Sequence, residues 1–291
     1  MADQAPELSS SNDDRNGDAP LCARVAHVTD VGRRRHNNQD NHLILPLGCD
    51  NLPPDPEQGP IEIERGGLLL AVADGMGGHF GGEEASRLCV ESLAKEIMTQ
   101  LQDSENGDPD LSAALQKTVE VTHQAVFAHA QAYVEKLTMG TTLTAVLLQG
   151  AHADIAQVGD SRAYLLRDGN LILLTQDQTI GNQLRSHGED FTKVDAHIQD
   201  MLVQAVGAQA GIDVIMAAVD VEPQDVLLLC TDGLYKVVPP ADIVETLELE
   251  IGLHEKATHL VARANEGGGP DNITVILTEI CQVQGTGLET D

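Results

Sequence analysis

Gly67-Leu68-Leu69-Leu70-Ala71-Val72-Ala73-Asp74-Gly75-Met76-Gly77-Gly78-His79 is the stretch that decides the fold. Six apolar residues precede a carboxylate, and glycines follow at once. A short apolar run bounded by turn residues is typical of a buried strand, so we expect Asp74 where that strand leaves the sheet. Hard divalent cations prefer carboxylate and carbonyl oxygens, so Asp74 and the Gly75 carbonyl predict a Mg²⁺ or Mn²⁺ site. A simple Asp-Gly hairpin turn is the alternative.

Composition limits the classes of partner. The 291 residues carry 17 Lys and Arg against 46 Asp and Glu, for a formal charge of −29, and 42% of them are hydrophobic. An acidic surface repels nucleic acid and anionic membranes, so neither is expected as a partner, whereas cations are favoured. Trp is absent, and Phe and Tyr number three each, so stacking platforms for bases are not expected either.

The cysteines and the chain ends indicate a cytoplasmic protein. No C-x-x-C pair occurs, and the number of cysteines is odd, which favours reduced thiols over a disulfide framework or a zinc site. The first residues contain no apolar core of a secretory signal, and no stretch is apolar for long enough to span a bilayer. The cysteines are Cys22, Cys49, Cys89, Cys230 and Cys281.

The order of predicted elements indicates an α+β protein. Strands and helices are segregated along the chain rather than strictly alternating. We expect a disordered acidic tail over residues 1–20, one domain over 21–283 with a polar flap at about 177–205, and a short tail over 284–291. The predicted strands are 22–28, 42–45, 67–73, 143–148, 153–158, 162–166, 171–175, 212–219, 225–230 and 272–279, and the predicted helices are 81–103, 110–137, 240–249 and 253–266.

Four more carboxylates occupy positions like that of Asp74. Asp160 and Asp232 each follow an apolar strand, and Asp40 and Asp271 each precede one. If these side chains meet at one edge of the sheets, they can bind two metal ions, and their mutual repulsion would require such ions. Taken singly, each is more often a turn residue than a ligand.

Together these stretches resemble a known family, the metal-dependent protein phosphatases of the PP2C (PPM) type, and most closely its compact bacterial members. The resemblance extends over about residues 22–281. The motifs that carry it are Thr29-Asp30-Val31-Gly32-x-x-Arg35-x-x-Asn38-Gln39-Asp40, Val72-Ala73-Asp74-Gly75-Met76-Gly77-Gly78-His79, Gly140-Thr141-Thr142, Val158-Gly159-Asp160-Ser161-Arg162-Ala163-Tyr164, Thr231-Asp232-Gly233-Leu234 and Gly269-Pro270-Asp271-Asn272-Ile273-Thr274.

The resemblance implies a central antiparallel β-sandwich flanked by helix pairs, with Mn²⁺ or Mg²⁺ in a cleft at one end. Two ions are implied, with a weaker third. The implied ligands are Asp74, bridging the ions, the Gly75 carbonyl, Asp232 and Asp271, with Asp40 binding an ion or its water and Asp160 serving the third ion together with Asp232.

Arg35 is implied as the phosphate-binding residue. A guanidinium matches two phosphate oxygens, which supports that role. Position alone does not choose among Arg33, Arg34 and Arg35, whereas the family spacing to Asp40 selects Arg35. The alternative is that Arg35 is one member of a solvated basic run.

The implied reaction is hydrolysis of phosphoserine and phosphothreonine by a water or hydroxide that bridges the two ions, without a phosphoenzyme. The implied catalytic residues are Arg35, Asp74 and Asp232. The implied partners are phosphoproteins and a serine/threonine kinase that the phosphatase opposes, and a monomer is expected.

Some positions depart from the family pattern. Met76 stands where animal relatives carry a proposed acid histidine, and His79 is expected to be structural. The flap has Asp177-Gln178-Thr179 where bacterial relatives carry a histidine, and it lacks their later basic residues. We therefore expect a preference for neutral or basic sequences around the phosphoresidue. Arg162 is expected to orient backbone or a carboxylate, Thr141 and Thr142 to pack beneath the site, and Cys230 to be a core residue.

Two other functions are weighed. A catalytically weak, phosphoprotein-binding pseudophosphatase would need a broken set of metal ligands, yet all the main carboxylates are present. A calcium-binding module would need a D-x-[DN]-x-[DN]-G loop, and Met76 and Gly78 occupy its ligand positions after Asp74.

Overall fold

The structure is a computed structural model, and it describes residues 20–47, 59–64, 67–77, 81–102, 110–132, 139–188 and 194–282. The predictions for the two tails, for Cys49 and for His79 therefore fall outside the described residues, except for residue 20. Among the described helices, none is both long and apolar enough to cross a membrane.

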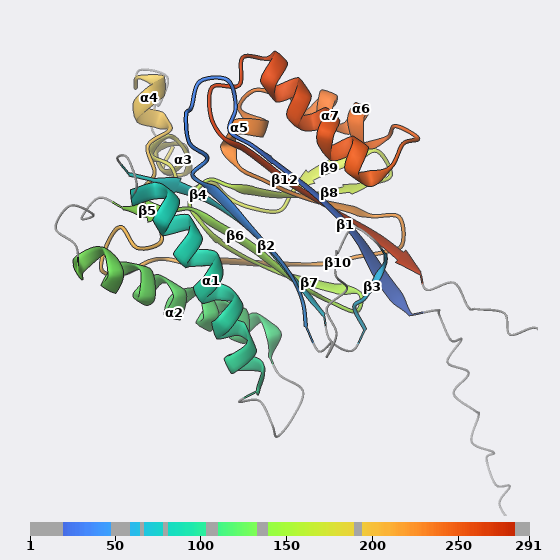
Figure 1. The fold of residues 1–291 in the computed structure, drawn as a ribbon, viewed down its shortest axis with the longest axis horizontal. Helices are drawn as coiled ribbons and strands as arrows, with labels where there is room; N and C mark the ends of the chain where they lie inside the picture. The colour runs from blue at the N-terminus through green and yellow to red at the C-terminus, as the bar shows by residue number, and fades with distance from the viewer. Residues whose placement is uncertain are drawn as a thin grey trace, which may run out of the picture.

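Two antiparallel sheets form the centre of the molecule (Figure 1). Every strand pair in them is antiparallel. The first sheet has the order β3 (Ile61–Glu62), β1 (Leu21–Asp30), β12 (Ile273–Gln282), β11 (Val226–Cys230), β8 (Arg162–Arg167) and β9 (Asn170–Leu173). The second has the order β10 (Ile215–Asp220), β7 (His152–Val158), β6 (Leu143–Gln149), β4 (Leu68–Met76) and β2 (Asp40–Pro46), with β5 (Gly140–Thr141) paired to β4.

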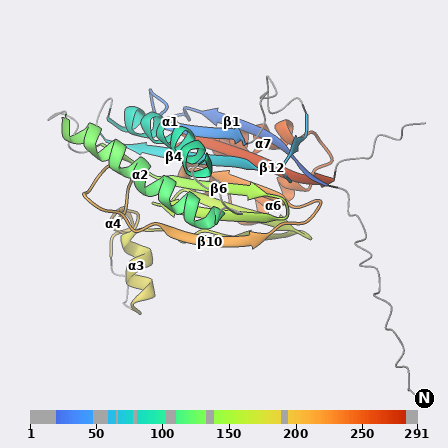
Figure 2. The same cartoon turned by 90° about the horizontal axis from the view of Figure 1, so that it is seen from below.

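Helix pairs cover the outer faces of the two sheets, as Figures 1 and 2 show. Helices α1 (Gly81–Gln102) and α2 (Leu111–Ala132) pack on the second sheet, and α6 (Pro240–Leu247) and α7 (Leu253–Glu266) pack on the first. The short helices α3 (Ile180–Ser186), α4 (Ala196–Gln199) and α5 (Asp232–Tyr235) lie toward one end of the sandwich. The predicted α+β class, with helix pairs flanking a sandwich, is confirmed.

The apolar run that precedes Asp74 is continuous because β4 is buried on both faces. Leu68, Leu70 and Val72 belong to the core between the two sheets, whereas Leu69 and Ala71 belong to the core beneath α1 and α2. All five side chains are fully buried. A strand covered on both sides needs apolar residues at every position, so the period-two alternation disappears.

Several predicted elements are confirmed with small shifts in their ends. The predicted turn at Asp168 and Gly169 joins β8 to β9, and both residues have positive φ (50° and 72°), as a tight hairpin requires. The flap contains the short helices α3 and α4. Strands β3 and β5 were not predicted, because two residues carry no periodic signal.

Two predictions are wrong. Asp74 does not mark the end of its strand, because β4 continues to Met76 by pairing with β5. Nor are all cysteines reduced. Cys22 of β1 faces Cys281 of β12 in the strand register, with their Cα atoms 5.0 Å apart, and the two form a disulfide across 259 residues. Cys89 and Cys230 are free and buried, as expected for Cys230.

Candidate active site

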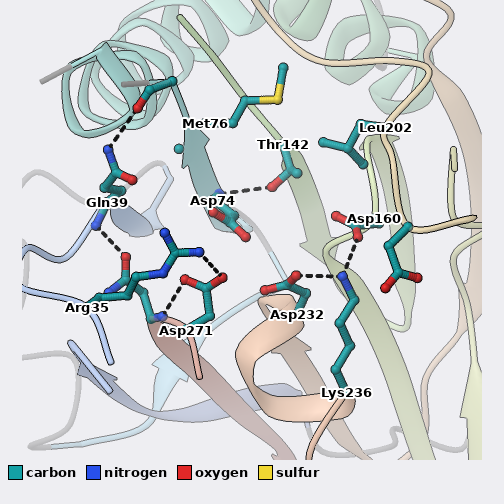
Figure 3. A pocket seen from close by; sticks show the side chains of 14 residues that line it. Arg35, Gln39, Asp74, Met76, Thr142, Asp160, Leu202, Asp232, Lys236 and Asp271 are labelled. Carbon is teal, nitrogen blue, oxygen red and sulfur yellow. Dashed lines mark hydrogen bonds and ion pairs between the residues drawn. The ribbon is translucent and has the colours of Figure 1, made fainter. Parts of the chain in front are cut away.

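A pocket of about 280 Å³ opens at the end of the sandwich where the predicted site residues meet (Figure 3). The side chains on its walls are mostly charged or polar. Of the predicted residues, only Asp40 is missing from the lining. The lining comprises Arg35, Gln39, Asp74, Gly75, Met76, Gly77, Thr142, Asp160, Asp200, Leu202, Asp232, Lys236, Asp271 and Asn272.

Strand β4 carries Asp74 to the pocket wall. The Asp74 backbone N–H donates to Thr142 Oγ1 at 2.9 Å, and Thr141 Oγ1 donates to the Asp74 carbonyl at 2.9 Å. Thr141 and Thr142 thus lie beneath the site, as predicted. Burial raises the pKa of Asp74 well above its ordinary value, and the charge of Asp40 raises it further.

The position after Asp74 is a glycine because no larger residue fits there. A Cβ at Gly75 would lie 2.1 Å from the carbonyl oxygen of Gly82 and 2.7 Å from that of Gln39. This close approach packs the end of β4 against the first turn of α1. Helix α1 is also held to the residue before β2, because Ser86 Oγ donates to the Gln39 carbonyl at 2.6 Å.

Asp40 lies beside Asp74 on the neighbouring strand, since the two are paired across β2 and β4, but it does not line the pocket. Asp40 is only 6% exposed, and its Oδ2 accepts hydrogen bonds from Thr231 Oγ1 at 2.7 Å and Thr274 Oγ1 at 2.8 Å. Its Oδ1 is buried without a hydrogen-bond partner in the described part of the chain. Burial raises the pKa of Asp40 to about 7, although both hydroxyls oppose the shift.

Asp232 and Asp160 both contact the ammonium group of Lys236. Asp232 begins helix α5 directly after β11, and Lys236 Nζ lies 2.7 Å from Asp232 Oδ2 and 3.4 Å from Asp160 Oδ2. Tyr235 donates its hydroxyl to the Asp160 carbonyl oxygen at 3.0 Å. Burial raises the pKa of Asp160 to about 6, and the charge of Asp232 adds to the shift while Lys236 opposes it. Burial lowers the pKa of Lys236, but the two carboxylates raise it above its usual range.

Arg35 is the arginine of its run that reaches the pocket. Arg35 Nη2 donates to Asp271 Oδ2 at 2.7 Å, and half of the Arg35 side chain remains exposed. That hydrogen bond raises the pKa of Arg35 above its usual value. In contrast, Arg33 and Arg34 donate their backbone N–H groups to the carbonyl of Gly269 and do not line the pocket. The family spacing and the geometry select the same residue.

Asn272 holds the loop that carries Arg35. Its Nδ2 donates to the carbonyls of Val31 at 2.9 Å and Asn37 at 3.0 Å, and its Oδ1 accepts from the Gln39 backbone N–H at 2.8 Å. Gly32 has φ of +76°, and a Cβ there would lie 2.1 Å from the Asp271 carbonyl oxygen. The residues between β1 and β2 are therefore fastened to the residues before β12.

Arg162 orients a carboxylate, as predicted. Its Nε and Nη2 donate to the two carboxylate oxygens of Asp177 at 2.9 and 2.7 Å, and its guanidinium lies 3.7 Å from the centre of the Tyr235 ring. Arg162 thereby joins β8 to the start of the flap and to α5.

The donor set fits divalent cations in its chemistry. Asp40 Oδ1 and Asp232 Oδ1 are buried oxygens without hydrogen-bond partners among the described residues. Burying a carboxylate oxygen without a hydrogen-bond partner is unfavourable in free energy, and a bound cation would offset this. As the side chains stand, no three acidic, imidazole or thiol groups in the described ranges meet closely enough to hold one ion. Side chains that hold an ion here would have to move from the positions that the structure shows.

Lys236 is a pocket residue that no predicted motif includes, and Thr231 and Thr274 are motif residues whose contacts with Asp40 were not predicted. A signal existed for Lys236, because it stands four residues after Asp232 and thus one helical turn away. Thr231 directly precedes Asp232, and Thr274 lies two residues after Asn272. Nothing in this spacing shows that both hydroxyls contact Asp40.

A two-sheet sandwich flanked by helix pairs, with five carboxylates and an arginine gathered at one end, defines a metal-dependent phosphohydrolase. Comparison with known proteins supports this class. The family model "Protein phosphatase 2C" matches residues 57–267. The serine/threonine phosphatase stp of Listeria innocua is 36% identical over 257 residues, which are 86% of this chain and 93% of the relative.

Solved structures give the same result. The catalytic domain of the serine/threonine phosphatase PstP, crystallised with two manganese ions, is 34% identical with a TM-score of 0.71 and covers 90% of this chain and 100% of that one. The serine/threonine phosphatase of S. agalactiae is 29% identical with a TM-score of 0.73 and covers 88% and 99%. The chain therefore belongs to the protein phosphatase 2C family and is a metal-dependent serine/threonine phosphoprotein phosphatase.

Proposed function

We propose that this phosphatase hydrolyses phosphoserine and phosphothreonine by direct attack of water, without a phosphoenzyme, and that it opposes a serine/threonine kinase. The observation that carries the proposal is that four of the predicted carboxylates and Arg35 line one pocket, with Asp40 beside Asp74 on the neighbouring strand. No cysteine or histidine among the described residues lines that pocket, so the described walls offer no side chain typical of a phosphoenzyme mechanism other than the carboxylates.

We assign two ions, Mn²⁺ or Mg²⁺, to residues at the end of β4, at the start of α5 and in the loop before β12. Asp74, the Gly75 carbonyl, Asp232 and Asp271 would hold the ions, with Asp40 binding an ion or its water. Bound ions supply Lewis acidity that makes water a nucleophile near neutral pH and neutralise the charge of the phosphate.

The chain's own residues supply position and charge. Arg35 would bind two oxygens of the phosphate, because its guanidinium is half exposed and its loop is fastened by Asn272. Thr231 and Thr274 hold Asp40 Oδ2, so that only Oδ1 is left to interact with an ion or a water. Met76 and Leu202 are the apolar side chains on the pocket wall (Figure 3).

Hydrolysis of an aryl phosphate and of a phosphothreonine peptide, with Mn²⁺ and after chelation, tests the proposal. We expect Mn²⁺-dependent turnover that falls by roughly 10²–10³ in kcat/KM in Asp74→Asn and Asp232→Asn. Asp220→Asn is the matched control, because Asp220 is exposed and pairs with His152 at the opposite end of β7 from Asp160.

Turnover that survives chelation would contradict the proposal. Tight binding of Mn²⁺ and phosphoprotein without turnover would favour the pseudophosphatase instead.

A further inference from the structure

Lys236 stands at the place where the sequence predicts a weaker third ion. The predicted ligands of that ion are Asp160 and Asp232, and Lys236 Nζ lies 3.4 Å from Asp160 Oδ2 and 2.7 Å from Asp232 Oδ2. Figure 3 shows the ammonium group between the two carboxylates on the pocket wall. The space between these carboxylates already holds a positive charge.

The backbone around Lys236 keeps the ammonium group close to both acids. Lys236 ends the short helix α5 that Asp232 begins, and its backbone N–H donates to the Asp232 carbonyl. Asp160 is held from the same helix, because the Tyr235 hydroxyl donates to its carbonyl oxygen at 3.0 Å and to its Oδ2 at 3.2 Å. Only 34% of the Lys236 side chain is exposed.

An ammonium group and a divalent cation exclude one another at this distance. A protonated lysine has three donors and no lone pair, so it cannot be a ligand, and it repels a cation that binds the same oxygens. Asp200 of the flap lines the same pocket and adds negative charge on that side. The exclusion therefore rests on position, because the Lys236 ammonium already contacts the carboxylate oxygens that a third ion would bind.

We propose that the Lys236 ammonium takes the place of the third ion, so that this phosphatase binds two ions and not three. The inference rests on the proposed two-ion site, with which it shares Asp232, but it concerns the position between Asp232 and Asp160. Lys236 is a positioning residue that fixes Asp160 and Asp232, and replacing it with an uncharged side chain should open a cation site between them.

Counting bound Mn²⁺ tests the inference without reference to turnover. The full chain is dialysed to equilibrium against a series of free Mn²⁺ concentrations, and bound manganese per chain is measured by elemental analysis. We expect Lys236→Met to bind one ion more than the wild type. Lys95→Met is the matched control, because Lys95 is exposed on α1 and should leave the count unchanged.

A second substitution locates the added ion. In the Lys236→Met background, Asp160→Asn should return the count to that of the wild type, because it removes one predicted ligand. Circular dichroism and urea unfolding check that each variant folds, and Lys236→Gln replaces Lys236→Met if the latter does not.

The outcomes separate this inference from the proposed function. Equal counts in the wild type and Lys236→Met, or a third ion already bound by the wild type, overturn the inference and leave the two-ion site standing. A wild type that binds no Mn²⁺ overturns both.

Discussion

The two sides of the pocket hold their carboxylates by different means. On the β2–β4 side, Asp40 and Asp74 form no ion pair with any residue that the structure describes, and Asp40 is held by the hydroxyls of Thr231 and Thr274. On the opposite side, Asp232 and Asp160 contact Lys236, and Asp271 contacts Arg35.

This difference shows where the chain depends on a bound cation. A buried carboxylate without a positive partner must take up a proton or bind an ion. On the Lys236 side, the chain supplies the positive charge itself. Substitutions on the β2–β4 side should therefore alter metal and proton binding. Substitutions on the opposite side should alter substrate binding and the number of bound ions.

The largest expected effect is a dependence of stability on pH that belongs to the β2–β4 side. Burial raises the pKa of Asp40 to about 7, against an ordinary value of about 3.9 in the unfolded chain. The metal-free folded state then binds more protons than the unfolded state between these values. The stabilisation is present below about pH 4 and is lost as pH rises through about 7.

Urea unfolding of the chelated protein from about pH 4.5 to about 7.5 measures this loss. We expect Asp40→Asn to remove a decrease on the order of 10² in the folding equilibrium constant over that range. The exposed control Asp168→Asn, in the turn between β8 and β9, should keep the decrease. Identical pH profiles for the two variants would refute the assignment.

The next effect belongs to the other side, at Arg35. Arg35→Lys keeps the charge but loses the fork that matches two phosphate oxygens, so kcat/KM for the phosphothreonine peptide should fall roughly 30-fold. Arg34→Lys is the matched control, because Arg34 belongs to the same basic run and does not line the pocket. Full activity in Arg35→Lys would mean that charge, and not the guanidinium fork, matters, and an equal loss in both variants would contradict a specific role for Arg35.

Removing the hydroxyls that hold Asp40 should have a smaller effect. Thr231→Val leaves Asp40 Oδ2 with one hydrogen bond in place of two, so Mn²⁺ affinity should fall by about 10-fold. Thr278→Val is a close control, because Thr278 is a buried threonine of β12 whose Oγ1 has no hydrogen-bond partner in the described part of the chain. Titration calorimetry with Mn²⁺ compares them, and equal affinities would contradict the role of Thr231.

The smallest effect concerns substrates. With a net charge of −29 and Asp200 on the pocket wall, phosphopeptides with basic flanking residues should be hydrolysed a few-fold faster at low salt than acidic ones. The difference should shrink at high salt, because exposed charges are screened. Equal rates at low salt would show that the acidic flap does not select substrates.

Much of the fold could be predicted from local pattern. The apolar run of β4, the turn at Asp168 and Gly169 and the stripes of α1 and α7 each show their structure within a dozen residues. The short strands β3 and β5 could not be predicted, because their pairing comes from partners distant in the chain. The same is true of the continuation of β4 past Asp74.

The Cys22–Cys281 disulfide could not be predicted from composition. An odd number of cysteines without close pairs favours reduced thiols, and nothing local opposes that prediction. The two residues face one another only because β1 and β12 pair over their whole length. Register across 259 residues is a tertiary property, and so is the bond that it permits.

By itself, the sequence determined the family, the reaction class and the set of carboxylates, because each motif is a short run whose residue types the chemistry requires. Only the tertiary structure decided which side chains neutralise those carboxylates. It placed Arg35 against Asp271, Lys236 between Asp160 and Asp232, and two threonines against Asp40. Such contacts depend on which strand ends and loops are brought together, and most of their partners are dozens to hundreds of residues apart in the chain.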